Sequence, residues 1–413
     1  MPRFIHAREP EESMTWNPIA TGQELPFHSI FSWNEVLDRA VDAYRKKVLK
    51  KTTMQDGSDL TARLAAYIYW GEEFLLGKID FSDGGSAIIK YYCCKPESYY
   101  TVIHEADTMG LVRRISSITV PPILDHEVYW RQYEDYDIYP WILMGFFSGD
   151  NAMFQRRGID PYETERKTWA LGRIHTTMAE LQTVIASLRF ENIGQIQYLE
   201  GRFVVGPIPG VGGPFNTAAE YFKALVKAPI ELATRGYIYD QVEQLVREGE
   251  IPTEDAKDLV QQFKEFPSMI ADLAERMPFS KGPFPLMHMN IAPYAIFVDE
   301  HFEIQALMDW QDSLVVPWEI YTPALTIHAP PAVLDKTVDR PRQFHFRTHQ
   351  KTYTNLVVGS EQRYGKDNKL SSQFADSELL DLAQAFWSYR KDEHIGFYKN
   401  VIDPLMKRVK ETE

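Results

Sequence analysis

Cysteine is almost missing from this sequence of 413 residues, which contains two, Cys93 and Cys94, next to each other. Adjacent residues of a strand point to opposite faces, so we expect no structural disulfide between them. A chain without paired cysteines fits a reducing compartment. The first 17 residues have neither the apolar segment of a secretory signal nor the arginine-rich pattern of a transit peptide. We therefore expect a cytoplasmic protein.

Long apolar runs and excess positive charge are missing as well. No stretch of ~18 apolar residues occurs, so we expect no membrane span. Lysine and arginine total 44 against 58 aspartate and glutamate, for a net charge of −14. This charge argues against non-specific nucleic-acid binding and against a basic membrane-binding patch. A cationic or neutral small molecule is the expected partner, although the charge could also serve solubility alone. The sequence is silent on oligomeric state.

The first 150 residues change from an irregular start to a strand pattern. Residues 1–31 contain four prolines and show no periodicity, and a helix is expected from Ser32 onward, with Glu35 completing a capping box. After a turn at Asp56-Gly57, the spacing predicts a short helix, a sheet of about five antiparallel strands and one inserted helix. The expected ranges are a helix at 58–66, strands at 67–70, 74–81, 87–92 and 141–144 with one more after Pro122, and a helix at 99–114.

The rest of the chain has mainly helical spacing. A Gly- and Pro-rich loop is expected at 194–215, and a β-hairpin is expected from 295–299 and 304–309, with Asp299 at its turn because Asp bonds its own backbone. We divide the chain into an N-terminal arm and helix (1–57), a β-rich lobe (58–150) and a helical lobe (151–413). The helices are expected at 162–188, 217–230, 236–249, 253–276 and 376–408.

The hairpin segment 284–312 resembles a known catalytic loop. The run from His288 through Asn290 to Ala295 is similar to the H-x-D-x-x-x-x-N loop of aminoglycoside-phosphotransferase-like kinases, and Leu307–Gln311 resembles the I-D-W-E that follows it. The segments 118–122, 141–144, 190–194 and 205–207 resemble other parts of the family, the last two those of its large fungal branch. The resemblance implies an α+β, protein-kinase-like two-lobed fold.

The resemblance also implies roles for single residues. Lys90 matches the lysine that contacts nucleotide phosphates, Glu105 matches its helical ion-pair partner, and Gly71 alone remains of the glycine-rich loop. Asp309 matches the ligand of Mg²⁺. His288 matches a residue that braces the loop by hydrogen bonds, and a role as general base is the alternative, since histidine titrates near neutral pH.

Two departures from the family pattern affect the expected chemistry. The catalytic aspartate is replaced by Asn290 and a metal-binding asparagine by Ala295. Phosphoryl transfer needs held phosphates, Mg²⁺ and a carboxylate that accepts the hydroxyl proton. An amide accepts no proton at neutral pH, and loss of general-base help costs about 10²–10⁴-fold in rate. We expect ATP and Mg²⁺ to bind weakly, or not to be required.

Three functions remain open at this stage. The first is a kinase-like protein that binds a small molecule, in fungal secondary metabolism, with impaired or lost phosphoryl transfer. The second is a cleft rebuilt for a non-phosphoryl reaction such as cyclisation, hydrolysis or isomerisation. The third is a non-catalytic pseudokinase scaffold, which would show an exposed apolar patch on the helical lobe.

Overall fold

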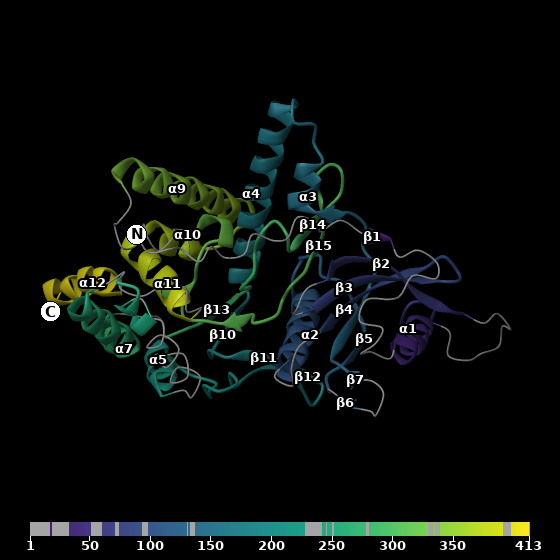
Figure 1. The fold of residues 1–413 in the computed structure, drawn as a ribbon, viewed down its shortest axis with the longest axis horizontal. Helices are drawn as coiled ribbons and strands as arrows, with labels where there is room; N and C mark the ends of the chain where they lie inside the picture. The colour runs from purple at the N-terminus through teal and green to yellow at the C-terminus, as the bar shows by residue number, and fades with distance from the viewer. Residues whose placement is uncertain are drawn as a thin grey trace.

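The protein has a β-rich N-terminal region and a mainly helical C-terminal region (Figure 1). This computed structural model describes residues 17–18, 33–50, 60–70, 74–92, 98–129, 131–132, 137–227, 242–244, 246–249, 252–277, 281–328, 334, 339–390 and 398–412. The predicted α+β fold is confirmed, with a small antiparallel sheet in the first part and helices in the second.

The N-terminal region is built on one antiparallel sheet of six strands, in the order β1-β2-β3-β4-β8-β5. The sixth strand, β1, comes from the arm that the sequence indicated to be irregular. The strands are β1 (Asn17–Pro18), β2 (Ala62–Trp70), β3 (Phe74–Phe81), β4 (Ser86–Tyr92), β8 (Trp141–Gly145) and β5 (Ile123–Glu127).

A helix covers each face of this sheet, α1 (Trp33–Lys47) on one side and α2 (Ser98–Ile115) on the other (Figure 1). Side chains of a strand alternate between its faces. Ile88 and Tyr92 of β4 pack in the cluster that includes α2, whereas Ile89 and Tyr91 pack in the cluster that includes α1. Both faces of β4 are therefore buried, which explains its nearly continuous apolar sequence.

Helices form most of the C-terminal region, and aromatic side chains from several of them pack together in its core. Phe263 and Phe266 pack against Tyr389 and Tyr398, with ring centroids 4.4–5.9 Å apart. Among the described residues no helix is both long and apolar enough to cross a membrane. The helices are α3 (Ala152–Arg157), α4 (Thr164–Ala186), α5 (Ala218–Val226), α7 (Thr253–Arg276), α9 (Arg340–Arg363), α10 (Lys369–Ala375), α11 (Ser377–Arg390) and α12 (Tyr398–Thr412).

Short strands connect the helices and carry the loops of interest. Two three-stranded sheets have the orders β10-β13-β16 and β15-β14-β9, and β11 pairs with β12, as β6 does with β7. The bounds are β6 (Arg131–Gln132), β7 (Asp137–Ile138), β9 (Asp150–Asn151), β10 (Arg189–Phe190), β11 (Gln195–Leu199), β12 (Arg202–Gly206), β13 (Phe284–Met287), β14 (Ile296–Val298), β15 (Ile304–Leu307) and β16 (Leu314–Val315), with 3₁₀ turns at Trp318–Ile320 and Leu325–Ile327.

Several sequence-based expectations were wrong. Within the helix expected at 58–66, residues 62–66 are instead the start of β2, because pairing with β3 overrides the helix propensity of their alanines and leucine. The loop expected at 194–215 contains the hairpin β11–β12, and α9 was not predicted. The expected helices at 162–188 and 253–276 are present as α4 and α7. The Ser32 cap, Asp56-Gly57, Cys93, Cys94 and, within the helix expected at 236–249, residues 236–241 and 245 lie outside the described residues.

Candidate functional site

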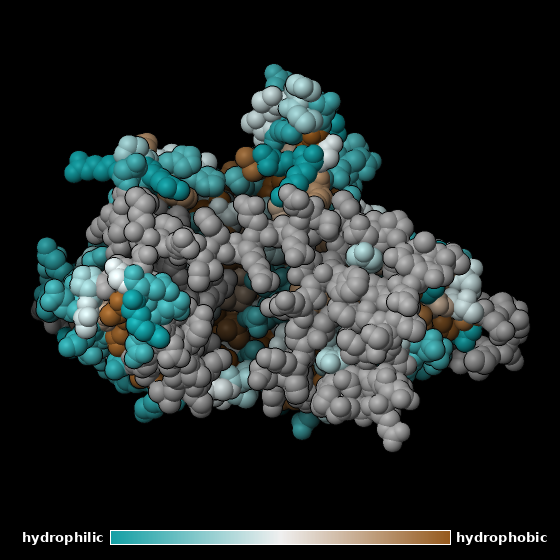
Figure 2. Space-filling view, in the orientation of Figure 1, coloured by the Kyte–Doolittle hydropathy of each residue, from teal (hydrophilic) through white to brown (hydrophobic). Residues whose placement is uncertain are grey.

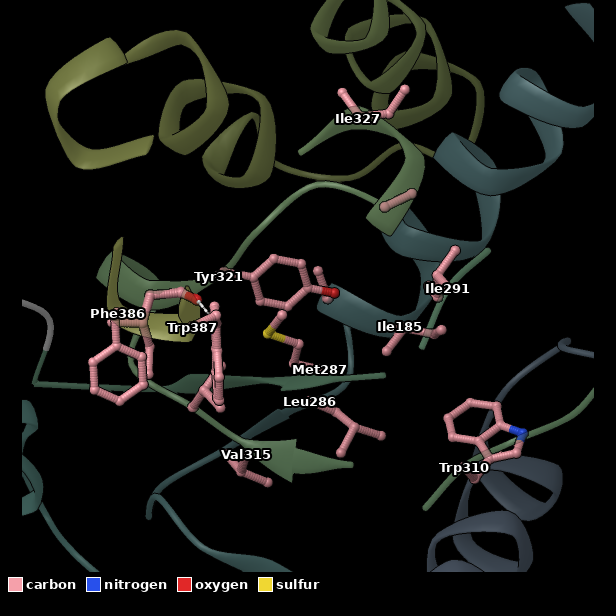
Figure 3. Packing of buried hydrophobic residues seen from close by; sticks show 14 of the residues in the cluster. Ile185, Leu286, Met287, Ile291, Trp310, Val315, Tyr321, Ile327, Phe386 and Trp387 are labelled. Carbon is pink, nitrogen blue, oxygen red and sulfur yellow. Dashed lines mark hydrogen bonds between the residues drawn. The ribbon is translucent and has the colours of Figure 1, made fainter. Parts of the chain in front are cut away.

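Packing holds the loop between β13 and β14, which carries the predicted catalytic residues. Leu286 and Ile291 are buried on either side of His288, and Trp310 is buried after β15 (Figure 3). Leu307, the last residue of β15, is buried as well. Burying a large apolar side chain contributes roughly 1.5–3 kcal/mol. Because four such side chains flank the loop, its backbone position is set by the core of the protein.

Lys90 is the one charged residue of β4 and lies inside the protein. Its side chain is 2% exposed. Strand alternation places it on the same face as Ile88 and Tyr92, toward α2. A lysine at such a position requires negative partners, because an unpaired buried charge is strongly unfavourable.

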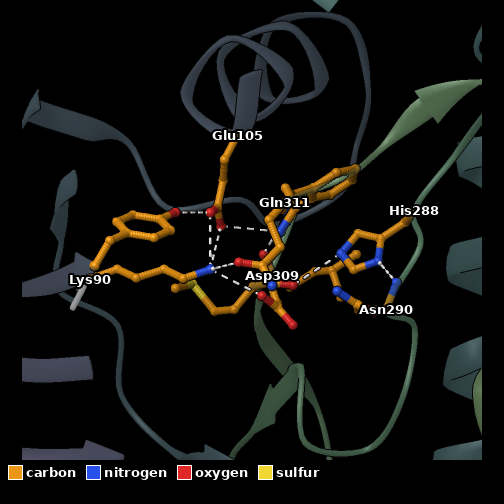
Figure 4. A network of polar contacts seen from close by, with 10 residues as sticks. Lys90, Glu105, His288, Asn290, Asp309 and Gln311 are labelled. Carbon is orange, nitrogen blue, oxygen red and sulfur yellow. Dashed lines mark hydrogen bonds and ion pairs between the residues drawn. The ribbon is translucent and has the colours of Figure 1, made fainter. Parts of the chain in front are cut away.

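Three polar side chains accept the N–H groups of Lys90 (Figure 4). Its Nζ lies 3.0 and 3.2 Å from the carboxylate oxygens of Glu105, 3.0 Å from Oδ1 of Asp309 and 3.1 Å from Oε1 of Gln311. An ammonium group has three N–H donors, one for each of these partners. The predicted ion pair between Lys90 and Glu105 is present, and Asp309 lies beside it.

The electrostatics keep this lysine charged. Burial alone lowers the pKa of Lys90, but the negative charges of Glu105 and Asp309 outweigh burial, and the pKa is raised above its ordinary value. The rings of Phe74 and Tyr92 add cation–π contacts, with centroids 4.7 and 5.1 Å from Nζ. Burial raises the pKa of Glu105, although the charge of Lys90 opposes this effect.

Glu105 joins three parts of the chain at one carboxylate. Besides the bonds from Lys90 of β4, Oε2 accepts the hydroxyl of Tyr92, and Oε1 accepts the backbone N–H of Trp310 at 3.2 Å. Helix α2, the sheet and the segment after β15 therefore meet at Glu105. Burial and the charge of Glu105 raise the pKa of Tyr92 well above its ordinary value, so the phenol remains a donor.

Asp309 combines a strained backbone with a partly exposed side chain. Its φ is +65°, in the left-handed region that aspartate tolerates better than most residues but that still costs of order 1 kcal/mol. The side chain is 19% exposed, and Oδ1 is the oxygen that accepts the N–H of Lys90. Asp309 is therefore the member of the cluster that faces the outside.

His288 braces the loop with both ring nitrogens. The backbone N–H of Asn290 donates to Nδ1 at 3.1 Å, so Nδ1 carries no proton. The proton of the neutral ring is then on Nε2, which donates to the carbonyl of Met308 at 3.0 Å. Burial lowers the pKa of His288 to about 4. This geometry supports the bracing role and leaves neither nitrogen available to a substrate.

Asn290 and Ala295 occupy the two positions at which the resemblance implies polar catalytic groups. Asn290 is partly exposed and follows His288 at the start of the loop. Ala295 is 2% exposed, and its backbone bonds Ala292 and Met308. The chain thus presents a neutral amide at one position and a buried methyl group at the other.

Three residues of the site had no role in the sequence-based prediction. Gln311 completes the coordination of Lys90, Tyr92 donates to Glu105, and Tyr294 lies close enough to Asp309 that burial and this carboxylate raise its pKa. Tyr92 could have been found, since it is two residues from Lys90 on the same strand face. Gln311 and Tyr294 carried no such signal. Gly71 lies outside the described residues, as do Glu72 and Glu73.

No protein-family model matches the chain, and neither does any curated protein sequence. Solved structures similar to it include the streptomycin–ATP–APH(2″)-IIa ternary complex, with 10% identity over 93% of this chain and 98% of that chain and a TM-score of 0.42. A second is a spectinomycin phosphotransferase with ADP and spectinomycin, with 12% identity over 90% of this chain and 97% of that chain and a TM-score of 0.35. A third is the macrolide 2′-phosphotransferase MphH from Brachybacterium faecium, with 11% identity over 88% of this chain and 98% of that chain and a TM-score of 0.33. At these low identities and TM-scores, the function has to be inferred from this chain's own residues.

Proposed function

We propose that this chain is a kinase-like protein of the aminoglycoside-phosphotransferase type that binds a small molecule beside Asp309 and has impaired or lost phosphoryl transfer. One observation carries the proposal. The loop from His288 to Ala295 is held in place by buried residues, yet it offers an amide at Asn290 and a methyl group at Ala295. The surrounding residues preserve the form of a catalytic loop without its reactive groups.

The loop contains no side chain suited to accept the proton of a substrate hydroxyl. Its sequence from His288 to Ala295 has no aspartate or glutamate. His288 is neutral, buried and bonded through both nitrogens. Loss of a positioned general base slows a reaction by about 10²–10⁴-fold. We therefore expect phosphoryl transfer to be very slow or absent.

The donor set also fits Mg²⁺ and nucleotide phosphates poorly. Mg²⁺ prefers one or two carboxylates together with phosphate oxygens and water. Here Oδ1 of Asp309 already accepts a bond from Lys90, and Asn290 and Ala295 add no charged oxygen. Among the described residues, no three His, Cys, Asp or Glu side chains are grouped to hold a metal ion. Phosphates would have to displace Asp309 or Gln311 from Lys90, which predicts weak nucleotide binding.

A titration tests nucleotide binding directly. The folded protein is heated with increasing ATP and MgCl₂, and in parallel with ATP and EDTA. We expect a rise in the melting temperature only at millimolar nucleotide, with little difference between the two series. A shift at micromolar ATP that depends on magnesium would contradict the proposal.

Restoring the missing groups provides the second test. The double variant Asn290→Asp, Ala295→Asn should hydrolyse ATP faster than the wild-type protein if the cleft still holds nucleotide. Asn368→Asp is the matched control, because it adds the same charge at an exposed position of the helical region. Unchanged turnover in the double variant would instead favour a rebuilt cleft.

A rebuilt cleft for a non-phosphoryl reaction is the second candidate function. It is favoured by the bonds of Lys90, whose three N–H groups all go to protein side chains, and by the placement of Tyr294 near Asp309. A setting in fungal secondary metabolism, implied by the sequence resemblance, belongs to this proposal. Location of the gene among biosynthetic genes and a product-forming activity lost in Tyr294→Phe would support it.

A pseudokinase scaffold is the third candidate. Large hydrophobic side chains are exposed on the helical region, including Tyr162 at 94%, Phe344 at 73% and Trp169 at 49%. In Figure 2 the projecting N-terminal end of α4 is mostly hydrophilic, with hydrophobic residues toward its base. A defined partner whose binding is lost in Phe344→Ser would favour this function, and a monomer with no partner would count against it.

A further inference from the structure

The hairpin β11–β12 belongs to the C-terminal region and lies against helix α2 of the N-terminal region. Its two strands are joined by Glu200 and Gly201, whose φ angles of +50° and +82° fit the tight two-residue turn typical of hairpins. At its base, Gly194 exchanges backbone hydrogen bonds with Val315 of β16, at 2.9 and 3.1 Å. A Cβ on Gly194 would lie 2.2 Å from the carbonyl oxygen of Gly206, so glycine is required there.

The hairpin contacts helix α2 at three points along its length. Nδ1 of His104 lies 3.3 Å from the carbonyl oxygen of Ile196, and the backbone N–H of Tyr198 donates to Oδ2 of Asp107 at 2.8 Å. The ring of Phe203 lies against Gly110, where a Cβ would be 3.2 Å from it. The missing side chain at Gly110 allows this close approach. Figure 1 shows the hairpin beside α2.

These contacts lie on the side of α2 opposite to Glu105. Successive residues of an α-helix are rotated by about 100°, so His104, Asp107 and Gly110 share one side. Glu105 and Val102 lie roughly on the other side, where Glu105 bonds Lys90 and Trp310. Helix α2 is thus held between the N-terminal sheet and a projection of the C-terminal region.

We propose that β11–β12 is a clamp that fixes α2, and through it Glu105, so that the cluster of Lys90, Glu105 and Asp309 stays closed. A kinase-like body with a free α2 could separate Glu105 from Lys90 by moving this helix. Here such a movement would also break the hydrogen bond at Asp107 and expose the Phe203 ring. The clamp restricts the movement of α2 whether or not the cleft binds nucleotide.

The clamp is tested in the full-length protein with the double variant Asp107→Ala, Phe203→Ala. Leu199→Ala, at the exposed end of the same hairpin, is the matched control. Hydrogen–deuterium exchange reports on residues 98–115, and acylation by an amine-specific reagent reports on Lys90, with Lys78 as the reference. Loss of one hydrogen bond and one aromatic contact should speed α2 exchange by about tenfold and raise Lys90 labelling. Lys78 labelling and the control variant should match the wild type.

A single-residue pair covers the case in which the double variant does not fold. Asp107→Ala removes the acceptor for the Tyr198 N–H, whereas Asp107→Asn keeps an oxygen there, so only the alanine variant should loosen α2. If α2 exchange and Lys90 labelling stay at wild-type values while the hairpin itself exchanges faster, the clamp is refuted. ATP titrations of the same variants measure nucleotide binding separately from α2 exchange and Lys90 labelling. A failure of the clamp can therefore be told apart from a failure of the proposed function.

Discussion

Lys90 sits between two carboxylates, and the charge balance of this cluster determines which of its residues can be replaced. Glu105 is buried as deeply as the lysine, whereas Asp309 is partly exposed. A buried charge that loses its partner costs far more than the pair itself contributes. Substitutions at Lys90 and Asp309 should therefore have very different effects, although both remove one member of the same contact.

We predict that Lys90→Met lowers the free energy of unfolding by about 3–5 kcal/mol, because it leaves Glu105 and Asp309 without a cation. Asp309→Asn keeps the ion pair between Lys90 and Glu105, and asparagine tolerates the positive φ. This variant should therefore lower the free energy of unfolding by about 1 kcal/mol. Urea unfolding of the two variants measures the difference. Equal losses would show that the cluster does not depend on the lysine charge.

The lowered pKa of His288 predicts that the free energy of unfolding depends on pH. This pKa is about 4 in the folded protein and 6.5 ordinarily, so the unfolded chain binds a proton more readily. The stabilisation from neutral His288 is fully present above pH 6.5, declines as the pH falls and is exhausted near pH 4. The change is of order 3 kcal/mol. His288→Gln should show a shallower decline in unfolding free energy over this range, and parallel curves would contradict the assignment.

At the scale of elements, the turn of the β14–β15 hairpin depends on one side chain. Oδ1 of Asp299 accepts the backbone N–H groups of His301 and Glu303, each at 2.9 Å, which is the turn-forming role expected from the sequence. The turn then allows Phe302 to bury its ring at a φ of +60°. The hairpin in turn positions Asp309.

We predict that Asp299→Ala costs about 1–2 kcal/mol of unfolding free energy, since two backbone donors lose their acceptor. Asn at this position keeps the oxygen and should recover most of the loss. Glu300→Ala, on an exposed side chain of the same turn, is the control and should change little. Thermal unfolding of the three variants measures this, and a large loss in the control would mean that charge rather than the turn is responsible.

At the scale of the whole molecule, hydrogen bonds join the β-rich and helical regions directly. The N–H of Leu307 donates to the carbonyl of Thr119 at 2.9 Å, Trp310 donates to Glu105, and Asp150 pairs with Val298. The clusters of buried residues show the same connection, since one of them includes α2 and most C-terminal helices. The proposed division at residues 57 and 150 therefore separates parts that share a core.

We predict that a fragment of residues 58–150 does not fold by itself. It lacks α1, which covers one face of the sheet, and it exposes the side of α2 that contacts β11. Circular dichroism of the fragment and the full chain during urea unfolding tests this. The full chain should unfold in a cooperative transition and the fragment should not, and a cooperative fragment would support an independent lobe.

The sequence predicted the features that depend on local patterns. The strand-forming run at residues 87–92, helical spacing at 253–276 and Asp299 at a turn are set by neighbours in the chain, and the structure contains each of them. The hairpin β11–β12 had a usable signal as well, an apolar alternation around Glu200-Gly201, which the abundance of glycine and proline obscured. The helix expected at 58–66 was wrong because its strand form depends on partners elsewhere in the sheet.

The sequence alone therefore determined the α+β character, the strand that carries Lys90 and the lack of a carboxylate in the loop from His288 to Ala295. Only the tertiary structure decided that Asp309 and Gln311 join Glu105 as acceptors of the Lys90 N–H groups, that both ring nitrogens of His288 are hydrogen-bonded and that the hairpin β11–β12 contacts α2. These facts depend on distances between residues as much as 221 positions apart in the chain. Local sequence patterns do not specify such distances, because the distances are set only when the core packs.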